Sequence, residues 1–107
     1  MRLLSNKLYT HKQLNATSWE VTLAEETHPV FKAHFQGNPL LPAFLQIDIF
    51  GELIDKKLLS IDRSKFKQPI LPNDKIIYTI LKVVENSYKI EIFKNDISTT
   101  EFKVSYQ

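Results

Sequence analysis

The chain contains 107 residues, of which 43% are hydrophobic and 24% are charged, and its formal net charge is +2. These values are typical of a soluble globular protein and predict a single domain over residues 1–107. Because the sequence has no cysteine, disulfides and thiolate chemistry are excluded. No apolar run approaches the ~20 residues of a membrane span, and residues 1–12 lack the apolar core of a secretory signal. A cytoplasmic protein without membrane contact is therefore expected.

The basic residues are spread along the chain and form no block of like charge. Such scatter is typical of a solvated surface, so nucleic-acid binding is not expected. The mildly basic balance would suit an acidic protein partner without requiring one.

The first predicted element is a strand over residues 17–23. Every second residue in it is apolar, namely Trp19, Val21 and Leu23. This alternation predicts one buried and one exposed face. Residues 25–29 interrupt the pattern, residues 30–35 favour no particular conformation, and Gly-Asn-Pro at residues 37–39 indicates a turn or kink.

A helix is predicted over residues 43–57. Pro42 suits its first position, because the N–H that proline lacks would have no partner there. The apolar side chains of the helix are Phe44, Leu45, Ile47, Ile49, Phe50, Leu53 and Ile54. They cover nearly the whole circumference of the first two turns, which is typical of a buried helix. Residues 60–64 are expected to form a short linker.

The second half of the sequence predicts strands separated by turns. The expected strands are residues 65–68, 75–84, 88–94 and 99–106. One buried helix followed by an antiparallel meander predicts an α+β fold in which a curved sheet wraps around the helix. So small a sheet leaves edges and one face to cover, which favours a homodimer or a dimer-based oligomer.

Two titratable residues, His34 and Asp48, stand in the most hydrophobic part of the chain. A buried carboxyl group either finds a partner or stays protonated, and an acid and an imidazole in one apolar cleft can perform acid–base chemistry near neutral pH. The N-terminus of the predicted helix, between them in sequence, offers free N–H groups that could polarise a carbonyl. A structural histidine and a solvent-facing aspartate are the alternatives that these residues leave open.

The same segment resembles the signature of the 3-hydroxyacyl-[acyl-carrier-protein] dehydratases, His-Phe-Pro-Gly-x-Pro-x-x-Pro-Gly-Val-Leu followed by an acidic residue. The matching positions are His34, Phe35, Gly37, Pro39, Pro42, Leu45 and, at the acidic position, Asp48. A second stretch, KFKQPILPND at residues 65–74, resembles the strand and turn Lys-Phe-Arg-Arg-Pro-Val-x-Pro-Gly-Asp of that family. The likeness covers almost the whole chain. The short segment between Asp48 and Lys65 is similar to the compact members associated with polyene-type pathways.

This resemblance implies a hot-dog fold and a lyase that removes water from 3-hydroxyacyl thioesters on acyl carrier protein, in fatty-acid or polyene-type lipid biosynthesis. It implies that His34 removes the α-proton and that Asp48, from the neighbouring subunit, protonates the leaving hydroxyl. The backbone N–H of Ala43 would bind the thioester carbonyl, Gly37 would belong to the substrate-binding loop, and Phe44 and Ile47 would line an acyl tunnel. No metal and no other cofactor is implied.

The sequence departs from the family pattern at two positions. Gln36 replaces a proline, and Ala43 replaces a glycine, so that a methyl group stands where close approach to the substrate is needed. Two alternatives therefore remain open: a non-catalytic hot-dog module that binds an acyl chain or acyl carrier protein, and a hot-dog thioesterase. The sequence specifies neither the acyl chain length nor any isomerase activity.

Overall fold

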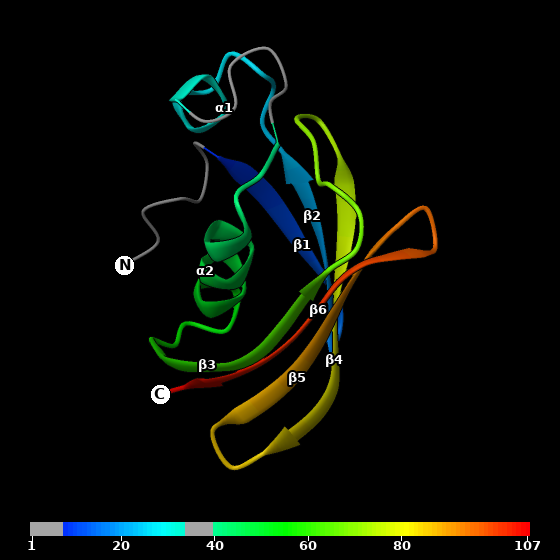
Figure 1. Ribbon diagram of the computed structural model, residues 1–107. Helices are drawn as coiled ribbons and strands as arrows, with labels where there is room; N and C mark the ends of the chain where they lie inside the picture. The colour runs from blue at the N-terminus through cyan, green and yellow to red at the C-terminus, as the bar shows by residue number, and fades with distance from the viewer. Residues whose placement is uncertain (1–7, 34–39) are drawn as a thin grey trace.

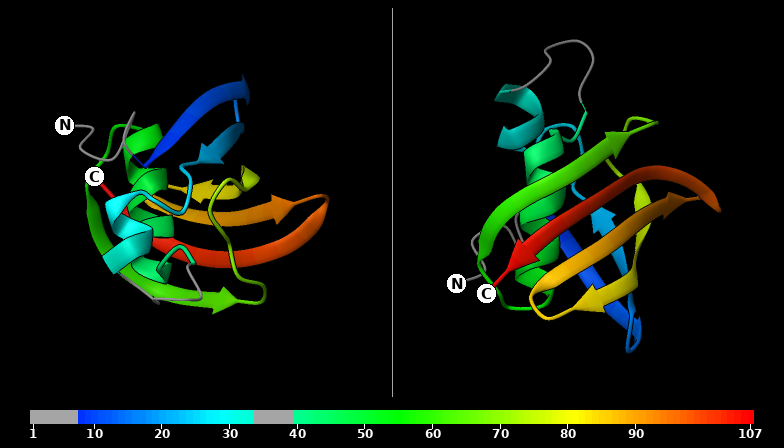
Figure 2. Two further views of the ribbon diagram at one scale, coloured as in Figure 1. Left: turned by 90° about the horizontal axis from the view of Figure 1, so that it is seen from above. Right: turned by 60° about the horizontal axis from the view of Figure 1, so that its bottom comes forward.

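The computed structural model describes residues 8–33 and 40–107 of the protein. One antiparallel sheet of six strands curves around a central helix, α2 (Figures 1 and 2). The strands lie in the order β1-β2-β4-β5-β6-β3. In chain order the elements are β1 (Tyr9–Asn15), β2 (Ser18–Leu23), α1 (Pro29–Ala33), α2 (Ala43–Leu53), β3 (Leu58–Phe66), β4 (Lys75–Val84), β5 (Ser87–Lys94) and β6 (Ile97–Tyr106). The architecture confirms the predicted α+β fold.

The core lies between α2 and the concave face of the sheet. Its centre is Phe50, which is fully buried. The ring of Phe50 contacts five aromatic rings, with centroid distances between 5.6 and 6.4 Å. These rings belong to Trp19, Tyr78, Tyr88, Phe102 and Tyr106. The alternation predicted for the strands is confirmed. The buried residues are Trp19, Val21 and Leu23 on β2, Tyr88, Ile90 and Ile92 on β5, and Phe102, Val104 and Tyr106 on β6.

Two tyrosine hydroxyls fix the helix on the sheet. Tyr78 on β4 donates to the carbonyl oxygen of Gln46 at 2.8 Å, and Tyr106 on β6 donates to that of Ile47 at 2.8 Å. Gly51 allows α2 to approach β6, since a Cβ at this position would lie 3.0 Å from a ring carbon of Tyr106. These contacts set the depth at which α2 lies in the sheet.

Two of the expected elements were wrong, and one strand was missed. The helix ends at Leu53 rather than at residue 57, because Asp55 adopts a left-handed φ of 55° that cannot continue an α-helix. Residues 60–64 belong to β3, and β1 was not predicted at all. β1 and β3 are the two edge strands of the sheet, and most of their side chains are exposed. Neither strand therefore shows the alternation of apolar and polar residues by which strands are recognised in a sequence.

Within the described ranges, no helix is both long enough and apolar enough to cross a membrane. The longest, α2, has 11 residues, about half of what a span requires.

Candidate functional site

Four of the predicted site residues lie on α2, and two lie outside the described residues. His34 and Gly37 belong to the latter, so their roles stay predictions. The helix begins at Ala43, directly after Pro42, and Pro42 provides no side-chain cap. The carbonyl oxygen of Pro42 accepts from the N–H groups of Leu45 and Gln46 at 3.1 and 3.3 Å. The N–H of Ala43 therefore belongs to the first turn, where N–H groups have no acceptor within the helix.

Asp48 lies five residues further along α2, in its second turn, and is half-buried. It lines a pocket of about 300 Å³ at the junction of α2 with the strands β3 and β6. The lining residues are Leu45, Asp48, Gly51, Glu52, Lys56, Lys57, Leu58 and Tyr106. Burial raises the pKa of Asp48, and the nearby carboxylate of Glu52 raises it further. Both causes favour the protonated form, which is the form that a proton donor requires.

Glu52 was not singled out in the sequence, although its spacing from Asp48 places both on one face of the helix. It is held by a contact from the other end of the chain, since the hydroxyl of Tyr9 on β1 donates to Glu52 Oε1 at 2.9 Å. The phenol of Tyr106 also lies near the site. Its pKa is raised by burial first and then by the charge of Asp48. The sequence offered no signal for either tyrosine, because both reach the site through tertiary structure.

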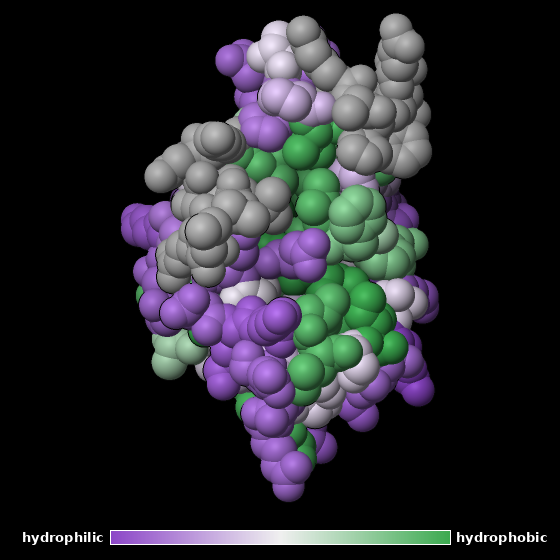
Figure 3. All heavy atoms as spheres, turned by 90° about the vertical axis from the view of Figure 1, so that its left-hand side faces the viewer, coloured by the Kyte–Doolittle hydropathy of each residue, from purple (hydrophilic) through white to green (hydrophobic). Residues whose placement is uncertain are grey.

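The two predicted lining residues lie in different environments. Ile47 is 2% exposed and belongs to the core, whereas the side chain of Phe44 is 56% exposed. Apolar surface is visible over the side of the molecule that carries α2, away from the sheet (Figure 3). Among the described residues, no group of three or more histidines and carboxylates could hold a metal ion.

Gln46 connects the start of this helix to the sheet. Its side chain is buried, accepts from the hydroxyl of Thr100 on β6 at 2.8 Å, and donates to the carbonyl oxygen of Leu41 at 3.3 Å. The N–H of Leu41 in turn donates to the carbonyl oxygen of Ile70 at 2.7 Å. The chain that leads into α2 is thus fixed from two sides, which places the free N–H groups and Asp48 relative to the sheet.

Comparison with known protein families identifies the family of the chain. The model of a family described as ApeI-like, ApeI dehydratase, matches residues 10–105. The chain belongs to the ApeI-like dehydratase family.

Curated relatives of this ApeI-like dehydratase chain carry a consistent name. The 3-hydroxyacyl-[acyl-carrier-protein] dehydratase FabZ of Thermotoga neapolitana is 34% identical over 74 residues, which are 60% of this chain and 54% of the relative. The protein of the same name from Campylobacter fetus subsp. fetus is 32% identical over 79 residues, covering 56% of this chain and 51% of the relative. The chain thus spans about half the length of the curated relatives that it matches.

Solved structures of low sequence identity share the fold. One chain of "The Dehydratase Heterocomplex ApeI:P from Xenorhabdus doucetiae" superposes with a TM-score of 0.74 at 20% identity, over 95% of this chain and 98% of that chain. An uncharacterised protein from Pyrococcus horikoshii matches with a TM-score of 0.61 at 14% identity, over 99% of this chain and 83% of that chain. The predicted hot-dog fold is confirmed.

Proposed function

We propose that this chain is a 3-hydroxyacyl-thioester dehydratase that acts on substrates carried by acyl carrier protein. The observation that carries the proposal is Asp48: a half-buried carboxyl whose surroundings favour its protonated form, near the free N-terminus of α2, in a member of a dehydratase family. The names of the curated relatives support the substrate class.

In the proposed reaction the thioester carbonyl oxygen accepts a hydrogen bond from the N–H of Ala43. His34 removes the proton next to the carbonyl, and the electron pair of that C–H bond forms the new carbon–carbon double bond. The bond between carbon and the 3-hydroxyl breaks, and Asp48 donates its proton to the leaving oxygen, so that water is released. The product is the trans-2-enoyl thioester, and transfer of a proton from His34 to Asp48 through solvent restores both groups.

We further propose that the working unit is a dimer and that Asp48 serves the neighbouring subunit. The exposed apolar surface over α2 supports this, together with the edge strands β1 and β3, whose outer backbone groups have no strand partner within the described sheet. A dimer would cover this apolar surface and bring two chains to one pocket.

The test begins with a 3-hydroxyacyl thioester on acyl carrier protein and follows formation of the conjugated enoyl thioester. Both His34→Ala and Asp48→Asn are expected to lose activity by about 10²–10⁴-fold, the usual contribution of a general acid or base. The two inactive variants are then co-expressed with different tags. If each site takes one residue from each chain, half of the dimers recover one intact site, and the mixture has about a quarter of wild-type activity.

The outcomes separate the alternatives. Complete inactivity of the mixture means that His34 and Asp48 act within one chain. Release of free thiol without an enoyl product identifies a thioesterase. Tight binding of the acyl thioester without turnover identifies a binding module, the alternative that Ala43 and Gln36 favour because they replace family residues.

A further inference from the structure

The outer face of the sheet carries a row of four cations, which lies on the side away from α2. In the strand register, Arg63 on β3 pairs with Lys103 on β6, Lys103 pairs with Lys89 on β5, and Lys89 pairs with Lys82 on β4. The four side chains are exposed. Lys89 and Lys103 each alternate with buried core residues, so they point away from the helix. We call Arg63, Lys82, Lys89 and Lys103 the cationic row.

Such a row opposes the stability of the sheet. Like charges directly opposite one another on neighbouring strands are unfavourable, and the row contains three such pairs. Within residues 8–33 and 40–107, the ion pairs are made by Lys67 and Lys94, so no member of the row forms one. Exposed like charges held in register form a surface that is complementary to an anionic partner.

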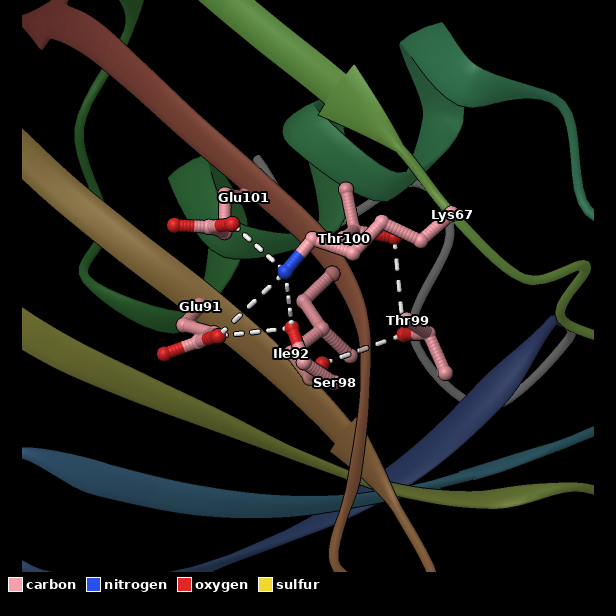
Figure 4. Close-up of polar contacts among 7 residues, drawn as sticks. All are labelled: Lys67, Glu91, Ile92, Ser98, Thr99, Thr100 and Glu101. Carbon is pink, nitrogen blue, oxygen red and sulfur yellow. Dashed lines mark hydrogen bonds and ion pairs between the residues drawn. The ribbon is translucent and has the colours of Figure 1, made fainter.

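In the neighbouring row on the same face, charges of opposite sign lie close together. There Glu91 on β5 pairs with Glu101 on β6, and Lys67 lies between them (Figure 4). Lys67 also donates to the hydroxyl of Ser98 at 2.8 Å, which in turn donates to Glu91 at 2.6 Å. The hydrogen bond from Lys67 is the main cause that lowers the pKa of Glu101. The charges of Lys65 and Lys89 lower this pKa as well, so Glu101 offsets part of the charge of the row. One carboxylate that is shared with Lys67 does not balance four cations.

The row lies in a hollow. An open groove of about 680 Å³ is lined by the four cations together with Lys65, Val84, Ser87, Glu101 and Phe102. Its walls come from four neighbouring strands, β4, β5, β6 and β3. The right-hand view of Figure 2 looks onto this side of the sheet, with α2 behind it. The groove thus combines four or more positive charges with the exposed apolar side chain of Val84.

We propose that this groove docks an acidic helix of a protein partner. Four strands spaced by about 4.8 Å give the row a length of about 14 Å, which equals about ten residues of an α-helix at 1.5 Å per residue. Carboxylates at positions i, i+3, i+7 and i+10 of such a helix would each face one cation of the row. The exposed side chain of Val84 would contact its apolar flank.

The geometry disfavours other occupants. A second copy of this face would bring positive charge against positive charge. A flat membrane surface would not follow a hollow whose cations line its walls. An added strand would dock at a sheet edge, where backbone groups are free, rather than on a face. The proposal is independent of the activity proposed for Asp48, whose pocket has a different lining on the helix side of the sheet.

The test is a binding measurement by fluorescence anisotropy with a labelled, stapled helical peptide that carries glutamate at these four positions. The double variant Lys89→Gln/Lys103→Gln is expected to bind it at least fivefold more weakly than wild type, because each exposed ion pair contributes a factor of a few. The matched control is Lys12→Gln/Lys75→Gln, which removes two exposed lysines outside the groove and should change binding less than twofold. Circular dichroism checks that both variants fold.

Three results would overturn the proposal. Equal weakening by the control variant would show that only net charge matters. Equal binding of the glutamine version of the peptide would show that the carboxylates do not matter. Row-dependent binding of vesicles of phosphatidylglycerol and phosphatidylcholine, or of inorganic polyphosphate, in the absence of peptide binding would assign the groove to a lipid surface or to another polyanion.

Discussion

The buried amide of Gln46 is predicted to be the polar group on which the start of α2 most depends. Replacing it by leucine removes the bond from Thr100 and the bond to the Leu41 carbonyl. Thr100 is fully buried and Gln46 is 4% exposed, so water does not replace these bonds without rearrangement. Each lost hydrogen bond costs about 1 kcal/mol, and a buried group left without a partner costs about 1–3 kcal/mol. We expect Gln46→Leu to lower the free energy of unfolding by about 2–4 kcal/mol.

A double variant distinguishes this reasoning from a simple packing effect. In Gln46→Leu/Thr100→Val the hydroxyl that lost its acceptor is also removed, so one unsatisfied group disappears. The loss of unfolding free energy in the double variant should therefore be about 1–2 kcal/mol smaller than the sum of the losses in the two single variants. The measurement is urea unfolding followed by circular dichroism, with all four proteins at one pH. Strict additivity, or a Gln46→Leu protein within about 0.5 kcal/mol of wild type, would refute the role given to this amide.

The remaining predictions concern charge and close packing. Burial and Glu52 raise the pKa of Asp48 in the folded state, so ionisation of Asp48 opposes folding. Asp48→Asn should therefore have a higher free energy of unfolding than wild type at neutral pH. This difference in free energy should vanish as the pH falls below the pKa of the carboxyl in the unfolded state. Glu52→Gln should lower the pKa of Asp48 and move the alkaline limb of the rate profile of kcat/KM to lower pH, whereas an unmoved limb would show that another group titrates there. Gly51→Ala should lose about 1–3 kcal/mol in denaturant unfolding, since its Cβ would meet both a carbonyl oxygen and the Tyr106 ring at 3.0 Å. Lys89→Glu should raise the free energy of unfolding by about 0.4–2 kcal/mol, because it turns two repulsive cross-strand pairs into attractive ones; a destabilised variant would contradict the register.

Sequence patterns predicted those elements in which side chains alternate between core and solvent. The bounds predicted for β4, residues 75–84, are the observed ones, because turns close it at both ends: Asn73 and Glu85 have left-handed φ angles of 66° and 55°. β1 and residues 58–64 of β3 escaped prediction because backbone pairing, rather than a buried face, holds an edge strand in the sheet. The helix was predicted four residues too long, since its C-terminal stop depends on the backbone angle of Asp55 and not on a glycine or proline.

From the sequence, residues of the site could be predicted only where they lie close together along the chain. Asp48 could be named because a carboxyl in an apolar run is unusual, and Glu52 could have been named from its position one turn later. Tyr9 and Tyr106 could not, since each lies more than forty residues from the group that it contacts along the chain. A raised pKa at Asp48 is thus a property of the assembled sheet and helix.

The cationic row shows the same limit more sharply. In sequence its members are scattered, and the spacing between them follows no period, so the charges predict only a solvated surface. In the sheet, β3 and β4 lie on opposite sides of the β5–β6 hairpin, and antiparallel register brings the four cations side by side. A helix would display a charged stripe at intervals of three or four residues, whereas a sheet assembles it from one residue per strand. A binding surface built on a sheet face therefore has no local signature, and only the register of the strands can reveal it.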